Sequence, residues 1–156
     1  MAVNPIPEGY PRVIPYLAIS DAAAALDFYQ DVLGAKERMR MAGPDGKIGH
    51  AELEIGDSVI MLADEFADIG HLGPKDGHSP VSICVYLDKV DDVFAKAIKK
   101  GAKEIQPVEN KFYGDRSGVF EDPWGHHWNV MMHIEDVPHD EMAKRSEAAM
   151  KEMGAG

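Results

Sequence analysis

The sequence predicts an α+β fold made of two copies of one β-α-β-β-β module, followed by a C-terminal helix. The word Gly-Ala-Lys-Glu occurs at residues 34–37 and again, 67 positions later, at residues 101–104. A helical pattern precedes each copy of the word, and alternating strand patterns follow it. A unit of about 65 residues is too long for a solenoid repeat and suits a duplicated small module.

Module 1 is expected over about residues 13–63. Pro15 lies within the first strand pattern, so it requires a position where no ladder N–H is needed. Ser20 or Asp21 is expected to cap the helix, and Gly34 to stop it. Strands are predicted at residues 13–19, 36–41, 50–55 and 58–63, with turns rich in glycine between the last three.

Residues 64–80 are rich in glycine and proline and have no sustained periodicity, so they are predicted to link the modules. Module 2 is expected over about residues 81–133. Its predicted elements are a strand at 81–87, a helix at 90–100, a strand at 103–108 and a hairpin of 115–121 with 126–133. A last helix is predicted at about residues 138–153. The whole chain, residues 1–156, is interpreted as one domain.

The second hairpin turns at Asp122-Pro123-Trp124-Gly125, because Pro123 cannot donate to a ladder and Gly125 takes positive φ readily. A period of two then places Trp128 and Val130 on the core face, and His127 and Asn129 on the opposite face. Gly49-His50-Ala51-Glu52 lies 69 positions before Gly118-Val119-Phe120-Glu121. This match predicts that Glu52 corresponds to Glu121, and Gly56 to Gly125.

Composition limits the classes of partner. The chain has 156 residues and a formal net charge of −11, which disfavours nucleic acid and anionic membrane surfaces. No apolar run reaches membrane-spanning length and the first residues lack signal-peptide character, so a soluble, cytoplasmic protein is expected. The single cysteine, Cys84, lies in an apolar strand and is expected to be a small buried side chain.

Several motifs occur in a characteristic order along the chain. They are residues 27–34 (DFYQDVLG) and 122–126 (DPWGH), then Tyr10 with 15–17 (PYL), 50–53 (HAEL) and 113–118 (YGDRSG). Together with the duplication, they resemble the glyoxalase/bleomycin-resistance/dioxygenase superfamily, also called vicinal oxygen chelate proteins, and its PhnB-like branch. The resemblance covers about residues 9–133. It implies that each module curls into half of a cup, with helices outside and a ligand cavity within.

The resemblance also implies a divalent metal held by His, Gln or Glu on the first and last strands of each module. The matching positions carry Ile14, Val81, Ile60 and Asn129. Three aliphatic side chains and one amide do not supply the roughly three donors that such an ion needs. The sequence therefore predicts no cofactor, while a divalent ion at relocated donors remains an alternative.

Candidate site residues lie on the strand faces turned away from the helices. Alternation places Ala51, Leu53 and Ile55 under the helix and leaves His50, Glu52 and Glu54 opposite. His50, Glu52 and Glu121 are the candidate catalytic residues, and with His127 they form the alternative metal set. The expected ligand-binding residues are Tyr16, His50, Glu52, Tyr113, Arg116, Glu121, His127 and Asn129. Solvated edge positions are the alternative for these polar residues. Arg116 is expected to pair internally with Asp115 or Asp122, or to clamp an anionic ligand.

The leading hypothesis is a metal-independent protein that binds a small molecule, analogous to antibiotic-sequestering members of the superfamily. The alternative is an enzyme of the glyoxalase-like lyase, isomerase or dioxygenase type, with a relocated metal or a metal-free acid/base pair. Exposed apolar residues at Met41 and Tyr86, and the Met142/Met153 side of the last helix, predict a homodimer.

Overall fold

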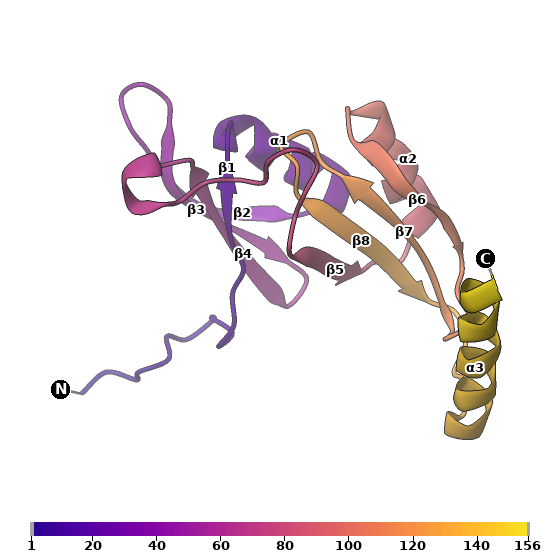
Figure 1. The fold of residues 1–156 in the computed structure, drawn as a ribbon. Helices are drawn as coiled ribbons and strands as arrows, with labels where there is room; N and C mark the ends of the chain where they lie inside the picture. Colours follow the sequence, from indigo (N-terminus) through magenta and orange to yellow (C-terminus); the bar gives the residue numbers. More distant parts are fainter. Residues whose placement is uncertain (1, 156) are drawn as a thin grey trace. The chain divides into compact units, whose positions relative to one another are not determined.

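The computed structural model describes residues 2–155 and forms two compact units, Met1–His78 and Ser79–Gly156 (Figure 1). The boundary between the units lies within the segment 64–80 that the sequence predicts as a linker. Each unit repeats the predicted β-α-β-β-β order. The interpretation of the whole chain as one domain stays a prediction.

Unit 1 is a four-stranded sheet in the order β1-β4-β3-β2, with one helix against one of its faces (Figure 1). β1 runs parallel to β4, and the other neighbouring strands are antiparallel. The elements are β1 Tyr16–Ile19, α1 Ala22–Leu33, β2 Lys36–Ala42, β3 Ile48–Ile55, β4 Ser58–Asp64 and the 3₁₀ turn η1 Ala67–Ile69.

α1 begins and ends at the residues that the sequence predicts. The Asp21 carboxylate accepts a hydrogen bond from the Ala24 N–H, which satisfies one of the free donors in the first turn. Gly34 closes the helix with φ of 68°, a left-handed conformation that glycine adopts without steric cost. The apolar face of α1 is buried, including Leu26 and Tyr29 at 0% exposure. The helix is therefore fixed by its caps and its apolar face together.

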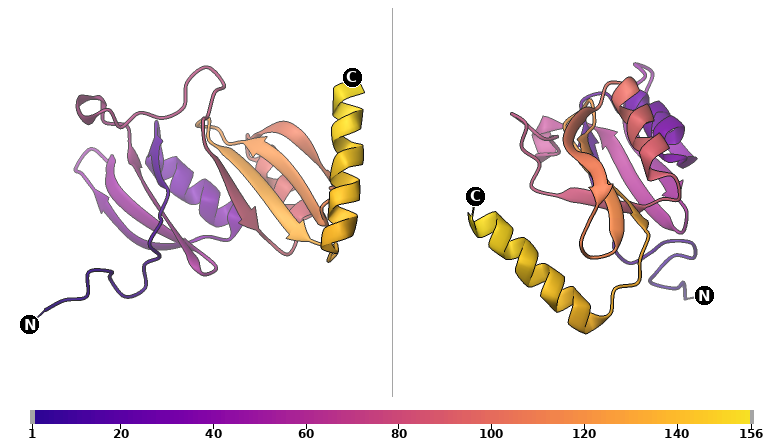
Figure 2. Two further views of the ribbon diagram at one scale, coloured as in Figure 1. Left: turned by 60° about the horizontal axis from the view of Figure 1, so that its bottom comes forward. Right: turned by 90° about the vertical axis from the view of Figure 1, so that its right-hand side faces the viewer.

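Unit 2 has the same architecture, with strand order β5-β8-β7-β6 and α2 across one face of the sheet (Figure 2). Its elements are β5 Ser82–Tyr86, α2 Val90–Lys99, β6 Lys103–Asn110, β7 Asp115–Glu121, β8 His127–His133 and α3 His139–Ala155. Pro107 lies in β6, which is an edge strand with shifted register beyond Gln106. An edge strand accommodates proline because its outward N–H positions need no partner.

The strand register confirms the duplication but corrects the predicted alignment of the hairpins. Lys36 lies opposite Glu54 in unit 1, and Lys103 lies opposite Glu121 in unit 2. Both ladders then shift at the next residues, between Glu37 and Met39 and between Glu104 and Gln106. The offset of 67 therefore continues into the hairpins.

Glu121 accordingly corresponds to Glu54, and Val119 corresponds to Glu52. The predicted offset of 69, which pairs Glu52 with Glu121 and Gly56 with Gly125, is wrong. The physical reason is the length of the turn, because the chain from Glu121 to His127 holds one residue more than the chain from Glu54 to Val59. A short sequence match around the turn cannot reveal this insertion.

The core of unit 2 forms where strand alternation predicts it. Trp128 and Phe120 are paired across β8 and β7, and both are fully buried. The Phe120 ring meets Phe94 of α2 edge to face, with 6.2 Å between the ring centroids. The Trp128 Nε1–H donates to Asp122 at 3.0 Å, and the other carboxylate oxygen of Asp122 accepts from two backbone N–H groups of the turn. The predicted register of β8 is confirmed.

Cys84 corrects one expectation, because it is exposed rather than buried. Its neighbours in β5, Ile83 and Val85, point to the opposite face and are less exposed than Cys84. An apolar strand composition does not identify which alternate positions a helix covers.

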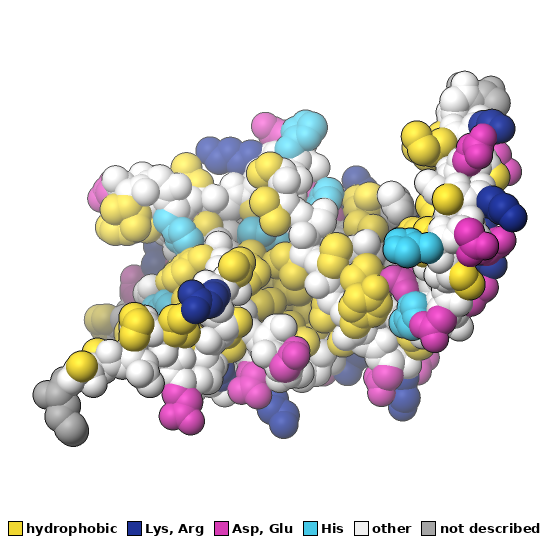
Figure 3. Space-filling model, turned by 90° about the horizontal axis from the view of Figure 1, so that it is seen from below, with side chains coloured by type: hydrophobic (Ala, Val, Ile, Leu, Met, Phe, Trp, Pro, Cys, Tyr) yellow, Lys and Arg dark blue, Asp and Glu magenta, His cyan; other side chains and the backbone are white. Residues whose placement is uncertain are grey.

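α3 is joined to unit 2 through Arg145. This side chain donates to Glu135, to Glu141 and to the Phe112 carbonyl. In the view of Figure 3, acidic and basic side chains follow the right-hand flank of α3. Met150 and Met153 near its end are 69% and 82% exposed. Within residues 2–155, every helix is too short or too polar to cross a bilayer.

Candidate functional site

A row of four hydrogen-bonded side chains crosses the face of the unit 1 sheet that is turned away from α1. The Tyr16 hydroxyl lies 2.8 Å from His50 Nδ1, and His50 Nε2 lies 2.9 Å from Glu52 Oε2. Tyr10 completes the row by donating its hydroxyl to Glu52 Oε1 at 2.7 Å. We call Tyr16, His50, Glu52 and Tyr10 the polar row.

Strand geometry explains why these side chains meet. Tyr16 of β1 lies opposite Met61 of β4, which lies opposite Glu52 of β3. His50 precedes Glu52 by two residues, so it shares the same face. Ala51 and Leu53, the alternate residues of β3, are fully buried on the helix side. The predicted orientation of His50 and Glu52 is therefore confirmed.

Glu52 is the buried centre of the polar row, with 4% of its surface exposed. Burial raises the pKa of its carboxyl group, but hydrogen bonds from His50 and Tyr10 outweigh burial and hold the pKa below its usual value. An ionised carboxylate only accepts hydrogen bonds, so His50 Nε2 carries the proton between them. In the neutral imidazole, Nδ1 then accepts the proton of the Tyr16 hydroxyl.

The two tyrosines remain protonated near neutral pH. Burial raises the pKa of Tyr16, and the negative charge of Glu52 raises it further. The hydrogen bond to Glu52 is the main cause of the raised pKa of Tyr10. Tyr16 is 44% exposed and is the most exposed member of the polar row.

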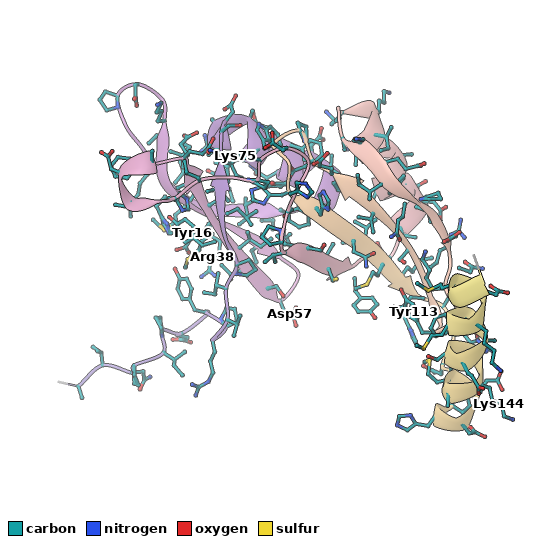
Figure 4. All side chains as sticks on the ribbon, in the orientation of Figure 1. Tyr16, Arg38, Asp57, Lys75, Tyr113 and Lys144 are labelled. Atoms are coloured by element: carbon teal, nitrogen blue, oxygen red, sulfur yellow. The ribbon has the colours of Figure 1, made fainter. Side chains whose placement is uncertain are left out.

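The N-terminal segment is fastened over one end of the polar row. The Arg38 guanidinium of β2 lies 4.5 Å from the centre of the Tyr10 ring, and its Nη1 donates to the Gly9 carbonyl. In Figure 4, Tyr16 and Arg38 lie near the point where the N-terminal segment meets the sheet. Arg38 thus helps to hold Tyr10 against Glu52.

Hollows adjoin both ends of the polar row. One, which we call the Tyr16 hollow, has a volume of about 560 Å³, within the range of small-molecule sites. It is lined by Tyr16, by residues 41–49 around the turn between β2 and β3, and by residues 63–71. The other hollow lies between residues 5–14 of the N-terminal segment and the side chains of Glu52 and Met61.

Unit 2 carries different chemistry on the corresponding face. Cys84 lies opposite Asn129, which lies opposite Val119, so these residues match Tyr16, Met61 and Glu52. His127 Nε2 and Glu121 Oε1 are 3.5 Å apart. Within the described residues, His127 Nε2 and Asn129 Oδ1 are buried without a hydrogen-bond partner. The predicted convergence of His50, Glu52, Glu121 and His127 on one ligand stays a prediction.

Arg116 and Tyr113 both have partners within unit 2. The expected internal pairing of Arg116 is confirmed, but the predicted partners Asp115 and Asp122 are wrong. Its Nε and Nη2 donate to both carboxylate oxygens of Asp91 in α2, and Nη1 donates to Asn110 of β6. Tyr113 packs edge to face on Phe112, with 5.3 Å between ring centroids. The role of Tyr113 in ligand binding stays a prediction.

The site-face residues do not fit the divalent ion that the superfamily implies. Among residues 2–155, three or more His, Cys, Asp or Glu side chains are nowhere grouped so that they could hold a metal. β4 turns Met61 to the site face, whereas Ile60, the predicted equivalent of Asn129, is buried on the helix side. The ring nitrogens of His50 and the oxygens of Glu52 are engaged within the polar row.

The model of the Glyoxalase/Bleomycin resistance protein/Dioxygenase superfamily matches residues 12–130, and the chain belongs to this superfamily. An uncharacterised protein of Mycobacterium bovis is 38% identical over an alignment of 152 residues that covers 94% of this chain and 96% of the relative. The crystal structure of TioX from Micromonospora sp. ML1 is similar with a TM-score of 0.63 and 27% identity, over 80% of this chain and 99% of TioX. A PhnB protein from Bacillus cereus has the same fold, with a TM-score of 0.63 and 16% identity over 78% of this chain and 99% of that protein.

Sequence reasoning missed the parts of the site that strand alternation does not describe. Tyr10 and Arg38 meet because an irregular segment folds back over β2, which no periodic pattern reveals. His71 lies in a loop, yet its ring meets Tyr16 edge to face, with 5.2 Å between ring centroids. For Tyr10 the sequence offers a weak signal, because a tyrosine three residues before a predicted strand is a candidate to cover a polar face; no such signal exists for His71 in the predicted linker.

Proposed function

We propose that unit 1 binds a small organic molecule in the Tyr16 hollow, without a resident divalent metal. The observation that carries the proposal is the polar row, in which a buried, ionised Glu52 fixes His50 and Tyr16 in one orientation. A buried carboxylate costs folding free energy unless it is fully hydrogen-bonded. Such an arrangement on an open sheet face is typical of a preorganised binding site.

The proposal gives a role to three members of the polar row. Glu52 keeps the proton of His50 on Nε2, and His50 Nδ1 accepts the proton of Tyr16. The lone pairs of the Tyr16 oxygen are then free to accept a hydrogen bond from a ligand. The hollow beside Tyr16 supplies mainly apolar contacts, which is the usual division of labour in small-molecule sites.

The test has two parts. Protein purified without added metal is analysed for divalent ions, and less than one tenth of an ion per chain is expected. The same protein is incubated with a metabolite extract, and the retained molecule is identified by mass spectrometry. Tyr16→Phe is expected to weaken retention about tenfold, because it removes one hydrogen bond. Tyr113→Phe is the matched control and should retain the molecule normally. One divalent ion per chain would contradict the proposal.

A second candidate function is supported by the same hydrogen bonds. The polar row can act as a metal-free acid/base relay of a lyase or isomerase. The Tyr16 oxygen would take a proton from the bound molecule while the Tyr16 proton passes to His50 Nδ1, and Glu52 would stabilise the resulting imidazolium. Exchange of a ligand proton for solvent deuterium would support this relay, and Tyr16→Phe should abolish the exchange. Binding without exchange would contradict the relay and would leave ligand binding as the remaining function.

We further propose that the protein is a cytoplasmic homodimer. Exposed apolar side chains motivate the assembly, among them Met41 at 58% and Tyr86 at 61% exposure. Light scattering at micromolar concentration is expected to give twice the 17.1 kDa mass of the chain. A deletion of residues 138–156 tests whether α3 contributes, because loss of the dimer would place this helix in the interface.

A further inference from the structure

The wall of the Tyr16 hollow formed by residues 65–73 is a fixed loop. The Phe66 N–H donates to the His71 carbonyl at 2.7 Å, and the His71 N–H donates back to Phe66 at 3.1 Å. The Glu65 carboxylate accepts from the Gly73 N–H, and the Glu65 N–H donates to the Ile19 carbonyl. A side chain at Gly73 would approach the Ala18 carbonyl to 2.8 Å, so this position requires glycine. The loop is thus held tightly against β1.

This loop presents an unusual histidine to the hollow. His71 lines the hollow, and its ring packs against the Tyr16 ring in a T-shaped arrangement. Its Nε2 atom is buried and has no hydrogen-bond partner among residues 2–155. Buried polar atoms of folded proteins are nearly always paired, so an unpaired one in a side chain that lines a hollow is a candidate for contact with a ligand.

The remainder of the lining restricts the chemistry of that ligand. Apolar side chains from both of these lining segments line the hollow, namely Met41, Ile48, Ala63, Phe66 and Ile69. The charged side chains of the lining are three acidic residues, Asp45, Asp64 and Glu65, and one basic residue, Lys47. The net charge of the lining is therefore negative. Both oxygens of Asp64 already accept backbone N–H groups, from Ala22 and Ile48. An anion is therefore disfavoured, and an apolar body is favoured.

We infer that the Tyr16 hollow takes an uncharged, mainly apolar molecule that carries a hydroxyl group, and that this hydroxyl binds His71 Nε2. A hydroxyl both donates and accepts, so it satisfies either tautomer of the imidazole. The inference rests on the proposed function, because it names the class of ligand for the same hollow. It adds His71 as the residue that determines specificity.

The test uses three probes that share a benzyl-sized body: benzyl alcohol, ethylbenzene and benzoate. Each is titrated into the full chain while the methyl resonances of Ile48 and Ala63 are followed by NMR. Benzyl alcohol is expected to bind about five- to tenfold more tightly than ethylbenzene, the value of one hydrogen bond. Benzoate is expected to bind at least tenfold more weakly than benzyl alcohol, because its charge meets the acidic lining.

The variant His71→Phe keeps an aromatic ring and removes the nitrogen, so it should equalise the affinities for benzyl alcohol and ethylbenzene. His78→Phe, in the same segment but outside the lining, is the matched control and should keep the preference for the alcohol. Equal binding of the two probes by the unaltered protein overturns the inference and leaves the proposed function standing. Absence of shifts at Ile48 and Ala63 with all three probes also overturns it. The proposed function fails by a different result, namely that no retained metabolite contacts unit 1.

Discussion

The two units have the same strand order and the same first register shift, yet their site faces differ at four central matched positions. Tyr16, His50, Glu52 and Met61 of unit 1 correspond to Cys84, Ser117, Val119 and Asn129 of unit 2. The shared features, including a glycine with positive φ after each helix (Gly34 and Gly101), belong to the scaffold. A buried carboxylate at the centre of this face occurs in unit 1, whereas unit 2 has valine there.

This difference shows that the repeated ladder positions side chains without determining their chemistry. A period of two exposes the same positions in both units, and the identity of a few residues decides whether a polar row forms. The proposed function therefore belongs to unit 1. Fold alone does not fix function, and here two copies of one module within a single chain make that point.

The largest effect is expected from the matched core positions, because both units depend on the same packing. Trp128 of unit 2 corresponds to Ile60 of unit 1, and both are buried. Trp128→Ala is expected to lower the free energy of unfolding by about 3–5 kcal/mol, and Ile60→Ala by about 2–5 kcal/mol. Urea unfolding followed by circular dichroism measures both. A loss below about 1 kcal/mol at either position would contradict the expectation that the two matched core positions contribute similarly to stability.

The next effect sharpens the contrast between the site faces. Glu52→Val gives unit 1 the residue of unit 2, and it should weaken binding of the retained molecule about tenfold, because His50 and Tyr16 lose their fixed orientation. Glu54→Val is the matched control, since Glu54 is on the same strand and face but outside the polar row. Calorimetric titration compares the two variants. Equal affinities would remove Glu52 from the site.

Acid is expected to destabilise unit 1 through Glu52. The folded-state pKa of Glu52 lies below its ordinary value of 4.5, so its stabilising contribution is complete above that pH and is lost as pH falls through the folded value. Glu52→Gln should flatten this part of the stability profile below pH 4.5. The melting temperature across this range provides the measurement, and an unchanged slope would contradict the assignment.

A smaller effect of opposite sign is expected in unit 2 at His133. Hydrogen bonds to Asp136 and Asp115 raise the pKa of His133 above its ordinary 6.5. Its contribution is therefore complete below that pH and is lost as pH rises through the raised value. Because the side chain is exposed, solvent screens the effect and a shift of a degree or two in melting temperature is expected. His133→Asn should remove this pH dependence above neutrality.

Most of the fold follows from local signals in the sequence. Asp21 and Gly34 mark the ends of α1, and alternation places Trp128 in the core and Glu52 on the site face. The errors occur where local pattern is insufficient. The offset is 67 before the second hairpin turn and 68 after it, so Asn129 matches Met61 and not Ile60, which the predicted offset of 69 gives. The partner of Arg116 is on α2, and a helix's position over a sheet is a tertiary feature.

About half of the candidate site can be predicted from the same local signals. His50, Glu52 and Tyr16 lie on regular strands, so their shared face follows from the period of two. Tyr10, Arg38 and His71 reach the site from irregular segments or across an edge, where long-range hydrogen bonds decide the path of the chain. The unpaired state of His71 Nε2 depends on every neighbour and cannot be inferred from spacing.

The most direct test of the central claim is NMR mapping of the retained molecule on the unaltered chain. The account predicts shifts at Tyr16, His50 and Glu52, with a loss of the Tyr16 shift in Tyr16→Phe. It predicts no shift at the matched positions Cys84, Ser117 and Val119. Shifts confined to Cys84, Ser117 and Val119 would contradict the account, because they would assign binding to the face that lacks the polar row.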